Sequence, residues 1–155
     1  MFASIAPNIE VLAETTNMDT VVLSTTEILS VSLDVVEDEI KNGNFEEAKQ
    51  LTKENSEFFS LQVLTLRESN SEITDEIHIL LLDMHNEIEA GNESLVLDNI
   101  ATIKNMLKQY EINSPDYGMA SAMILTIVDE QYQIANKDGD EYRYEVSEKL
   151  LDRVN

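Results

Sequence analysis

The sequence predicts an all-α protein, an antiparallel four-helix bundle with additional C-terminal helices, five to six helices in all. Apolar residues recur three and four positions apart along most of the chain, which is the spacing of a buried helix face. No segment alternates apolar and polar residues between turn signals, as a half-buried strand would. The stretch EIKNGN at residues 39–44 also returns as EIEAGN at residues 87–92, as two similar helix corners would.

Each copy of this repeat is expected to be the bend of a helical hairpin. Gly43 and Gly91 end amphipathic runs, and glycine readily adopts the left-handed conformation that closes a helix. Asn44 begins an Asn-x-x-Glu start signal that resembles a capping box, and Asn92 or Ser94 is expected to cap the helix after the second corner. The repeat fits either a duplicated hairpin or convergence on one favourable corner.

The apolar stripes place four helices of similar length before the last third of the chain. At 1.5 Å per residue, each would be about 30 Å long, which suits an antiparallel bundle. These helices are expected over residues 19–42, 45–68, 72–90 and 94–110. Their shared interior is predicted to contain Leu33, Phe59, Leu81 and Ile103.

Two further helices are expected after residue 113. Ser114-Pro115 is a helix start signal, because Ser caps a helix and Pro suits its first position. A fifth helix then extends to about residue 136, and its small residues at 117–123 would let a neighbouring backbone approach closely. Asp138-Gly139 turns the chain into a last helix over residues 141–154.

The length and composition indicate one globular domain. The chain has 155 residues, of which 43% are hydrophobic, enough for a core within one domain. We expect residues 1–18 to be an N-terminal extension and residues 19–155 to form a single helical-bundle domain.

The net charge of −21, from 31 acidic and 10 basic residues, narrows the classes of partner. Such a charge repels phosphate backbones and anionic lipids, so we expect no nucleic acid and no membrane surface as partner. No apolar run reaches the roughly 18 residues that a membrane span needs. The charge suits cations, basic proteins or simple solubility. Cysteine is absent, which excludes disulfides and thiolate chemistry.

The sequence contains no recognisable catalytic motif. There is no serine elbow, no glycine-rich phosphate loop and no zinc-protease motif, and the expected protein is therefore not an enzyme.

The candidate metal ligands are histidines and carboxylates on two of the predicted helices. His78 and His85 lie seven residues, about 10 Å, apart along one helix, too far to share an ion whose ligand bonds are near 2 Å. The alternative for each histidine is an ordinary half-buried side chain, and the alternative for the acidic residues is a solvated helix face. The candidate sets are His85 with Glu89, His78 with Asp75, and the patch formed by Asp34, Glu37 and Asp38.

Four stretches resemble the extracytoplasmic helical domain attached to high-affinity iron permeases and kept by their secreted relatives. They are GNFEEAKQLTKE (43–54), ILLLDMHNEIEAGN (79–92), IATIKNMLKQYE (100–111) and IVDEQYQIANKDGDEYRYEVSEKLLDRV (127–154).

The last stretch holds Asp129-Glu130-x-Tyr132, a DG turn and Glu141-Tyr142 in the family's order, although Asp140 alone separates the turn from Glu141. The permease's Arg-Glu-x-x-Glu iron motif is not reproduced, since Ser71 stands at its last position after Arg67-Glu68. The resemblance implies an extracytoplasmic location, secreted or at the cell surface, and iron or another metal cation as cofactor.

Two hypotheses follow. The first is a non-enzymatic, extracytoplasmic acidic helical-bundle protein that binds a cation or iron, or is accessory to a metal-uptake system. The second is a protein-interaction or sensor-type bundle that acts as a subunit of a larger assembly, through apolar residues that spill beyond the buried stripes. Those residues are Val21, Leu23, Val35, Ile79 and Leu82.

Location and assembly are less constrained by the sequence. The first basic residue is Lys41, so export would require a leader upstream of Met1 with the usual basic region. A cytoplasmic location and any number of copies in the assembly stay open.

Overall fold

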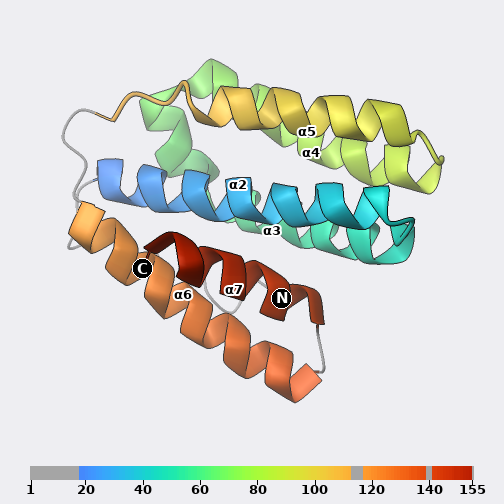
Figure 1. Cartoon of the computed structure of the whole chain (residues 1–155). Coiled ribbons are helices and arrows are strands. Elements are labelled where there is room, and N and C mark those ends of the chain that lie inside the picture. The colour runs from blue at the N-terminus through green and yellow to red at the C-terminus, as the bar shows by residue number, and fades with distance from the viewer. Residues whose placement is uncertain (1–17, 113–116, 139–140, 155) are drawn as a thin grey trace.

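The computed structural model describes residues 18–112, 117–138 and 141–154, and within these ranges it is all-α, without strands (Figure 1). The predicted fold class is confirmed. The helices are α2 (Met18–Lys41), α3 (Phe45–Ser69), α4 (Ser71–Glu89), α5 (Glu93–Leu107), α6 (Tyr117–Asp138) and α7 (Glu141–Val154). The predicted start signal at Ser114-Pro115, the Gly139 turn and most of the predicted N-terminal extension lie outside the described residues.

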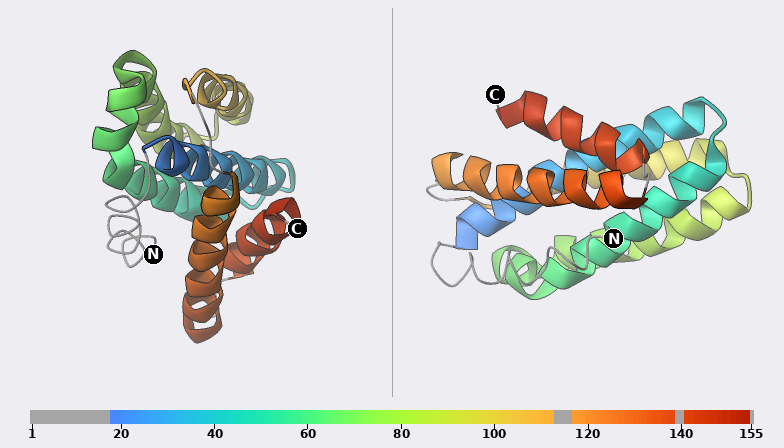
Figure 2. Two further views of the ribbon diagram at one scale, coloured as in Figure 1. Left: turned by 90° about the vertical axis from the view of Figure 1, so that its left-hand side faces the viewer. Right: turned by 90° about the horizontal axis from the view of Figure 1, so that it is seen from below.

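Helix α2 occupies the centre of the fold. It packs against α3, α5, α6 and α7, while α3 packs against α4 and α4 against α5. The end-on view shows α2 with the other helices arranged around it (Figure 2). Buried residues consequently cover most of the circumference of α2, and only one stripe, which includes Glu27, Asp34 and Asp38, stays partly exposed. The finer prediction of an antiparallel four-helix bundle stays a prediction, because α6 and α7 share the central helix with α3 and α5.

One hydrophobic core joins these helices. Leu33, Phe59, Leu81 and Ile103 are each 0% exposed and belong to a single cluster of buried residues. The predicted common interior of α2, α3, α4 and α5 is therefore confirmed. The same cluster extends to Ile127 of α6 and Leu150 of α7, so the C-terminal helices add to this core.

The two repeated corners share one backbone geometry. Gly43 has φ +80° and Gly91 φ +77°, a left-handed conformation that favours glycine. The Asn44 amide donates to the Glu39 carbonyl at 2.8 Å and the Gly43 amide to the Ile40 carbonyl at 3.1 Å. The second corner repeats both bonds, which together form a Schellman motif. The repeat thus encodes a helix stop.

Asn44 and Asn92 occupy the N-cap positions as predicted, but the side-chain hydrogen bonds expected of them do not form. Asn44 instead donates through Nδ2 to the buried Glu39 carboxylate at 2.8 Å, which gives that carboxylate a partner inside the corner. The cap that does form is Asn70, whose Oδ1 accepts from the Ile73 amide at 3.0 Å and starts α4.

Small residues allow other helices to pack closely around most of α2. Ser24 donates to the Thr20 carbonyl at 2.8 Å and lies 3.4 Å from the Ala120 carbonyl of α6. This contact places α2 beside the small-residue start of α6. Ser32 donates to Asn55 Oδ1 across the α2–α3 interface, so the polar groups among these tightly packed helices are partly paired with one another.

Helix α5 ends at Leu107, three residues earlier than predicted, and the following turn buries Tyr110. The Thr74 hydroxyl donates to the Asn70 carbonyl at 2.7 Å. Since a hydroxyl has one proton, Thr74 Oγ1 accepts from the Tyr110 hydroxyl, 2.8 Å away. This bond fastens the end of α5 to the start of α4.

Burial raises the pKa of Tyr110 above its usual 10.0, and the negative charge of Asp75 adds to the rise. The folded state therefore holds the phenol proton more tightly than the unfolded state, and the stability that Tyr110 provides is lost as pH rises above about 10. We expect the free energy of unfolding from urea titrations to fall more steeply above pH 10 for the native protein than for Tyr110→Phe. Parallel curves would contradict the burial of this hydroxyl.

Among the helices described here, none is both long and apolar enough to cross a membrane.

Candidate functional site

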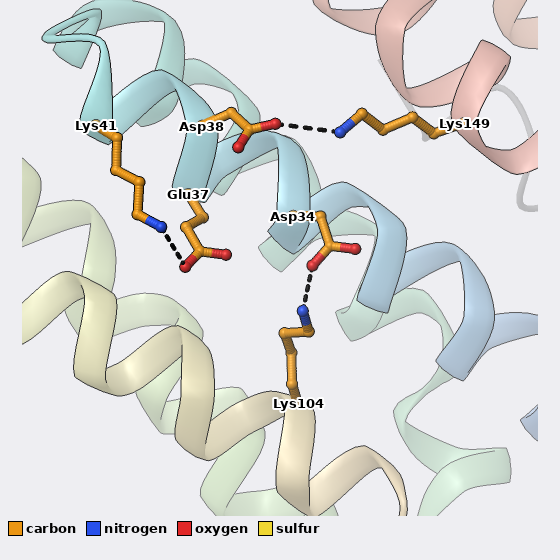
Figure 3. Close-up of polar contacts among 6 residues, drawn as sticks. All are labelled: Asp34, Glu37, Asp38, Lys41, Lys104 and Lys149. Carbon is orange, nitrogen blue, oxygen red and sulfur yellow. Dashed lines mark hydrogen bonds and ion pairs between the residues drawn. The ribbon is translucent and has the colours of Figure 1, made fainter.

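Each carboxylate predicted on α2 as a metal ligand lies against a lysine. Figure 3 shows the three pairs, whose lysines come from α2, α5 and α7. An ammonium group thus stands beside each carboxylate, where a cation would bind. Exposed pairs of this kind contribute about 0–1 kcal/mol each, but the pairs made by Lys104 and Lys149 also join α5 and α7 to α2. The pairs are Asp34 with Lys104, Glu37 with Lys41 at 3.1 Å, and Asp38 with Lys149 at 3.1 Å.

The first predicted histidine pair is turned towards α3. His78 Nε2 lies 2.9 Å from Ser60 Oγ, and Asp75 forms an ion pair with Arg67. The Ser60 hydroxyl donates its proton to the Ser56 carbonyl at 2.8 Å, so it accepts from His78, which must carry hydrogen on Nε2. That nitrogen is therefore engaged as a donor and is unavailable as a metal ligand in this arrangement.

The two residues of the second predicted pair, His85 and Glu89, also have separate surroundings. Glu89 forms an ion pair with Lys49 of α3 at 3.2 Å, whereas His85 lines a hollow on the surface. Across the described ranges, no three His, Asp or Glu side chains gather closely enough to hold a metal ion. The structure brings none of the three predicted sets together as a coordination site.

The α3–α4 hairpin carries four exposed aliphatic side chains. Leu61 and Leu64 of α3 are 41% and 82% exposed, and Ile79 and Leu82 of α4 are 59% and 52% exposed. Residues three apart lie on the same side of a helix. The Ser60–His78 contact joins the two helices between these pairs. We call these four residues the α3–α4 outer face.

The apolar residues predicted to lie on the surface are buried or half-buried on α2 but exposed on α4. Val21 and Val35 of α2 are 0% exposed and Leu23 is half-buried, so the prediction that α2 supplies an apolar surface is wrong. Helices α6 and α7 pack on α2, and the single apolar stripe read from the sequence did not predict this. Ile79 and Leu82 do reach the surface.

Sequence reasoning missed Leu61 and Leu64. The signal was present, because both lie outside the stripe assigned to the buried side of α3, on the side opposite Phe59 and Leu66.

A hollow of about 410 Å³ lies in the groove between α3 and α4. Leu81, which is 0% exposed, and Leu82 give it an apolar base. The polar residues that line it are Lys53, Ser56 and Glu57 of α3, and His85 and Asn86 of α4. The hollow has room for one large apolar side chain next to a carboxylate.

The two carboxyls with a raised pKa do not form a catalytic pair. Burial, followed by the charge of Asp129, raises the pKa of Glu130 on α6. Burial, followed mainly by the charge of Glu39, raises the pKa of Glu145 on α7. Both shifts have burial as their first cause and neighbouring carboxylates as their second, as packing in an acidic protein would produce.

Comparison with protein-family models, with curated proteins and with solved structures gives no match. The resemblance to the helical domain of iron permeases, with the location and cofactor that it implies, therefore stays a prediction. Several residues of its most specific stretch, among them Tyr132, Glu141 and Tyr142, have side chains outside the described set.

Proposed function

We propose that this protein is a non-enzymatic helical interaction module that holds a partner protein on the α3–α4 outer face. The observation that carries the proposal is the grouping of four exposed aliphatic side chains on one hairpin. Single exposed aliphatic residues are ordinary, whereas a group with a polar rim is typical of an interaction site. Covering such a group removes apolar area from water, at about 25 cal/mol per Å².

The grouping distinguishes this face from the other exposed apolar residues. Tyr117, Met119 and Leu125 of α6 are also exposed. At 100° per residue, however, Met119 points away from Tyr117 and Leu125, and these last two lie more than two turns apart. Leu95 and Phe45 lie near the starts of different helices. The α3–α4 hairpin alone offers two aliphatic pairs on adjoining helices within the described chain.

Cation binding is the weaker of the two hypotheses on geometric grounds. Every candidate carboxylate lies against a lysine or arginine, and among the residues that the structure describes no three His, Asp or Glu side chains form a group that could hold a metal ion. An extracytoplasmic location and a role beside a metal-uptake system remain proposals that the resemblance alone supports.

Site-specific photo-crosslinking in the native cell tests the proposal. A photoreactive phenylalanine analogue at position 64 or 82 should give one discrete adduct with a partner protein. The same analogue at position 125, where Leu125 is 41% exposed on α6, is the matched control and should not give that adduct. Leu64→Ser should abolish the adduct formed from position 82. An absence of adducts at both positions, or the same adducts at position 125, would refute the proposed function.

A further inference from the structure

We infer that the partner presents a basic amphipathic helix, which lies along the α3–α4 groove and inserts one large apolar side chain into the hollow beside Leu82. This inference rests on the proposed function and specifies the chemistry of the partner.

The hollow supplies the place for an apolar anchor. Its base is formed by the fully buried Leu81 and the half-exposed Leu82, and α3 contributes Glu57 to its wall. Interfaces derive most of their binding energy from a few large side chains that fill such pockets. A hollow of about 410 Å³ accepts a leucine, methionine or aromatic side chain.

The spacing of the apolar residues fits a helix better than an extended segment. Leu64 lies seven residues beyond Glu57 along α3, about 10 Å at 1.5 Å per residue. Two turns of a partner helix span the same distance, so an anchor in the hollow would place the residue at i+7 beside Leu64. The residues at i+3 and i+4 would then lie near Ile79, which is the usual pattern of a helix bound in a groove.

The charge around the face selects a basic partner. Residues 45–89 hold eleven carboxylates and three Lys or Arg. Glu57 lies one turn before Leu61, and Glu68 one turn after Leu64, so acidic groups flank the aliphatic residues on α3. A second copy of this chain would bring another net charge of −21 to the interface, and like charges oppose such contact.

Three synthetic peptides of about 18 residues test the inference by fluorescence anisotropy in about 0.1 M salt. The first is a Lys/Leu/Ala helix with apolar residues at i, i+3, i+4 and i+7. The second has the same composition in an order that gives no apolar face. The third replaces each Lys of the first with Glu. The first peptide should bind at least about tenfold more tightly than either of the others.

Matched variants locate the binding. Leu82→Ser should weaken the first peptide about tenfold, whereas Leu95→Ser, at a residue 45% exposed on α5, should change its Kd less than about twofold. Glu57→Lys and Glu148→Lys alter the net charge equally, but Glu148 is on α7, which packs on α2 and α6. Only Glu57→Lys should weaken binding about three- to tenfold.

Equal binding of the first and second peptides, or equal effects of the two charge variants, would overturn the inference by showing only general attraction to an acidic protein. Tight binding of the acidic peptide would also overturn it. If adducts form from position 64 or 82 while the basic helix does not bind, the inference fails and the proposed function stands. If those adducts are absent, the proposed function itself fails.

Discussion

Val35→Asp is expected to lower the free energy of unfolding by about 4 kcal/mol or more, enough to unfold a marginally stable domain. Val35 is 0% exposed. It lies eleven residues, three turns, beyond Ser24, and so on the side of α2 that meets α6. A carboxylate there would lose its hydration without a partner, which costs several kcal/mol. Urea titration followed by circular dichroism measures the change.

Ile79→Asp is the matched control for this variant. Ile79 is 59% exposed on α4, so the same kind of substitution should change the free energy of unfolding by no more than about 0.5 kcal/mol. Similar small losses for both variants would mean that α6 and α7 do not cover α2 in solution. Similar large losses would mean that the α3–α4 outer face is itself covered, which would also contradict the proposed function.

This pair of residues shows how far the sequence predicts the fold. The apolar stripes on α3, α4 and α5 predict Phe59, Leu81 and Ile103 as core residues, because each helix buries mainly one side. Helix α2 buries all of its surface except one narrow stripe, which includes Glu27, Asp34 and Asp38. A stripe cannot indicate how many neighbours a helix has, so Val35 and Ile79 look equivalent in the sequence although one is enclosed and the other exposed.

The two helix corners could be predicted because their signal is local in the sequence. Gly43 and Gly91 require a left-handed backbone that the sequence signals directly. The caps were less predictable, because Asn44 had a competing partner in Glu39, an interaction formed only once the corner folds. Tertiary contact, rather than local preference, decides which hydrogen bond such a side chain makes.

The candidate metal ligands could not be assessed from spacing alone. Helical spacing places Asp34, Glu37 and Asp38 near one another, but it does not show which other helices approach them. Lys104 comes from α5 and Lys149 from α7. A chain with 31 acidic and 10 basic residues thus places scarce lysines where helices meet, and those contacts depend on the three-dimensional arrangement.

Phe59→Ala is expected to lower the free energy of unfolding by about 3–5 kcal/mol, because it removes a fully buried ring and leaves a cavity. Phe59 is 0% exposed, and its ring centroid lies 6.1 Å from that of His78, directly beneath the contact that joins α3 to α4. Leu64→Ala, on the same helix but at a residue 82% exposed, should change stability by no more than about 0.5 kcal/mol. Urea titrations of both variants measure this contrast. A loss below about 1 kcal/mol for Phe59→Ala would show that the core does not lie between α3 and α4, and the outer face would then lack the rigid support that a docking surface needs.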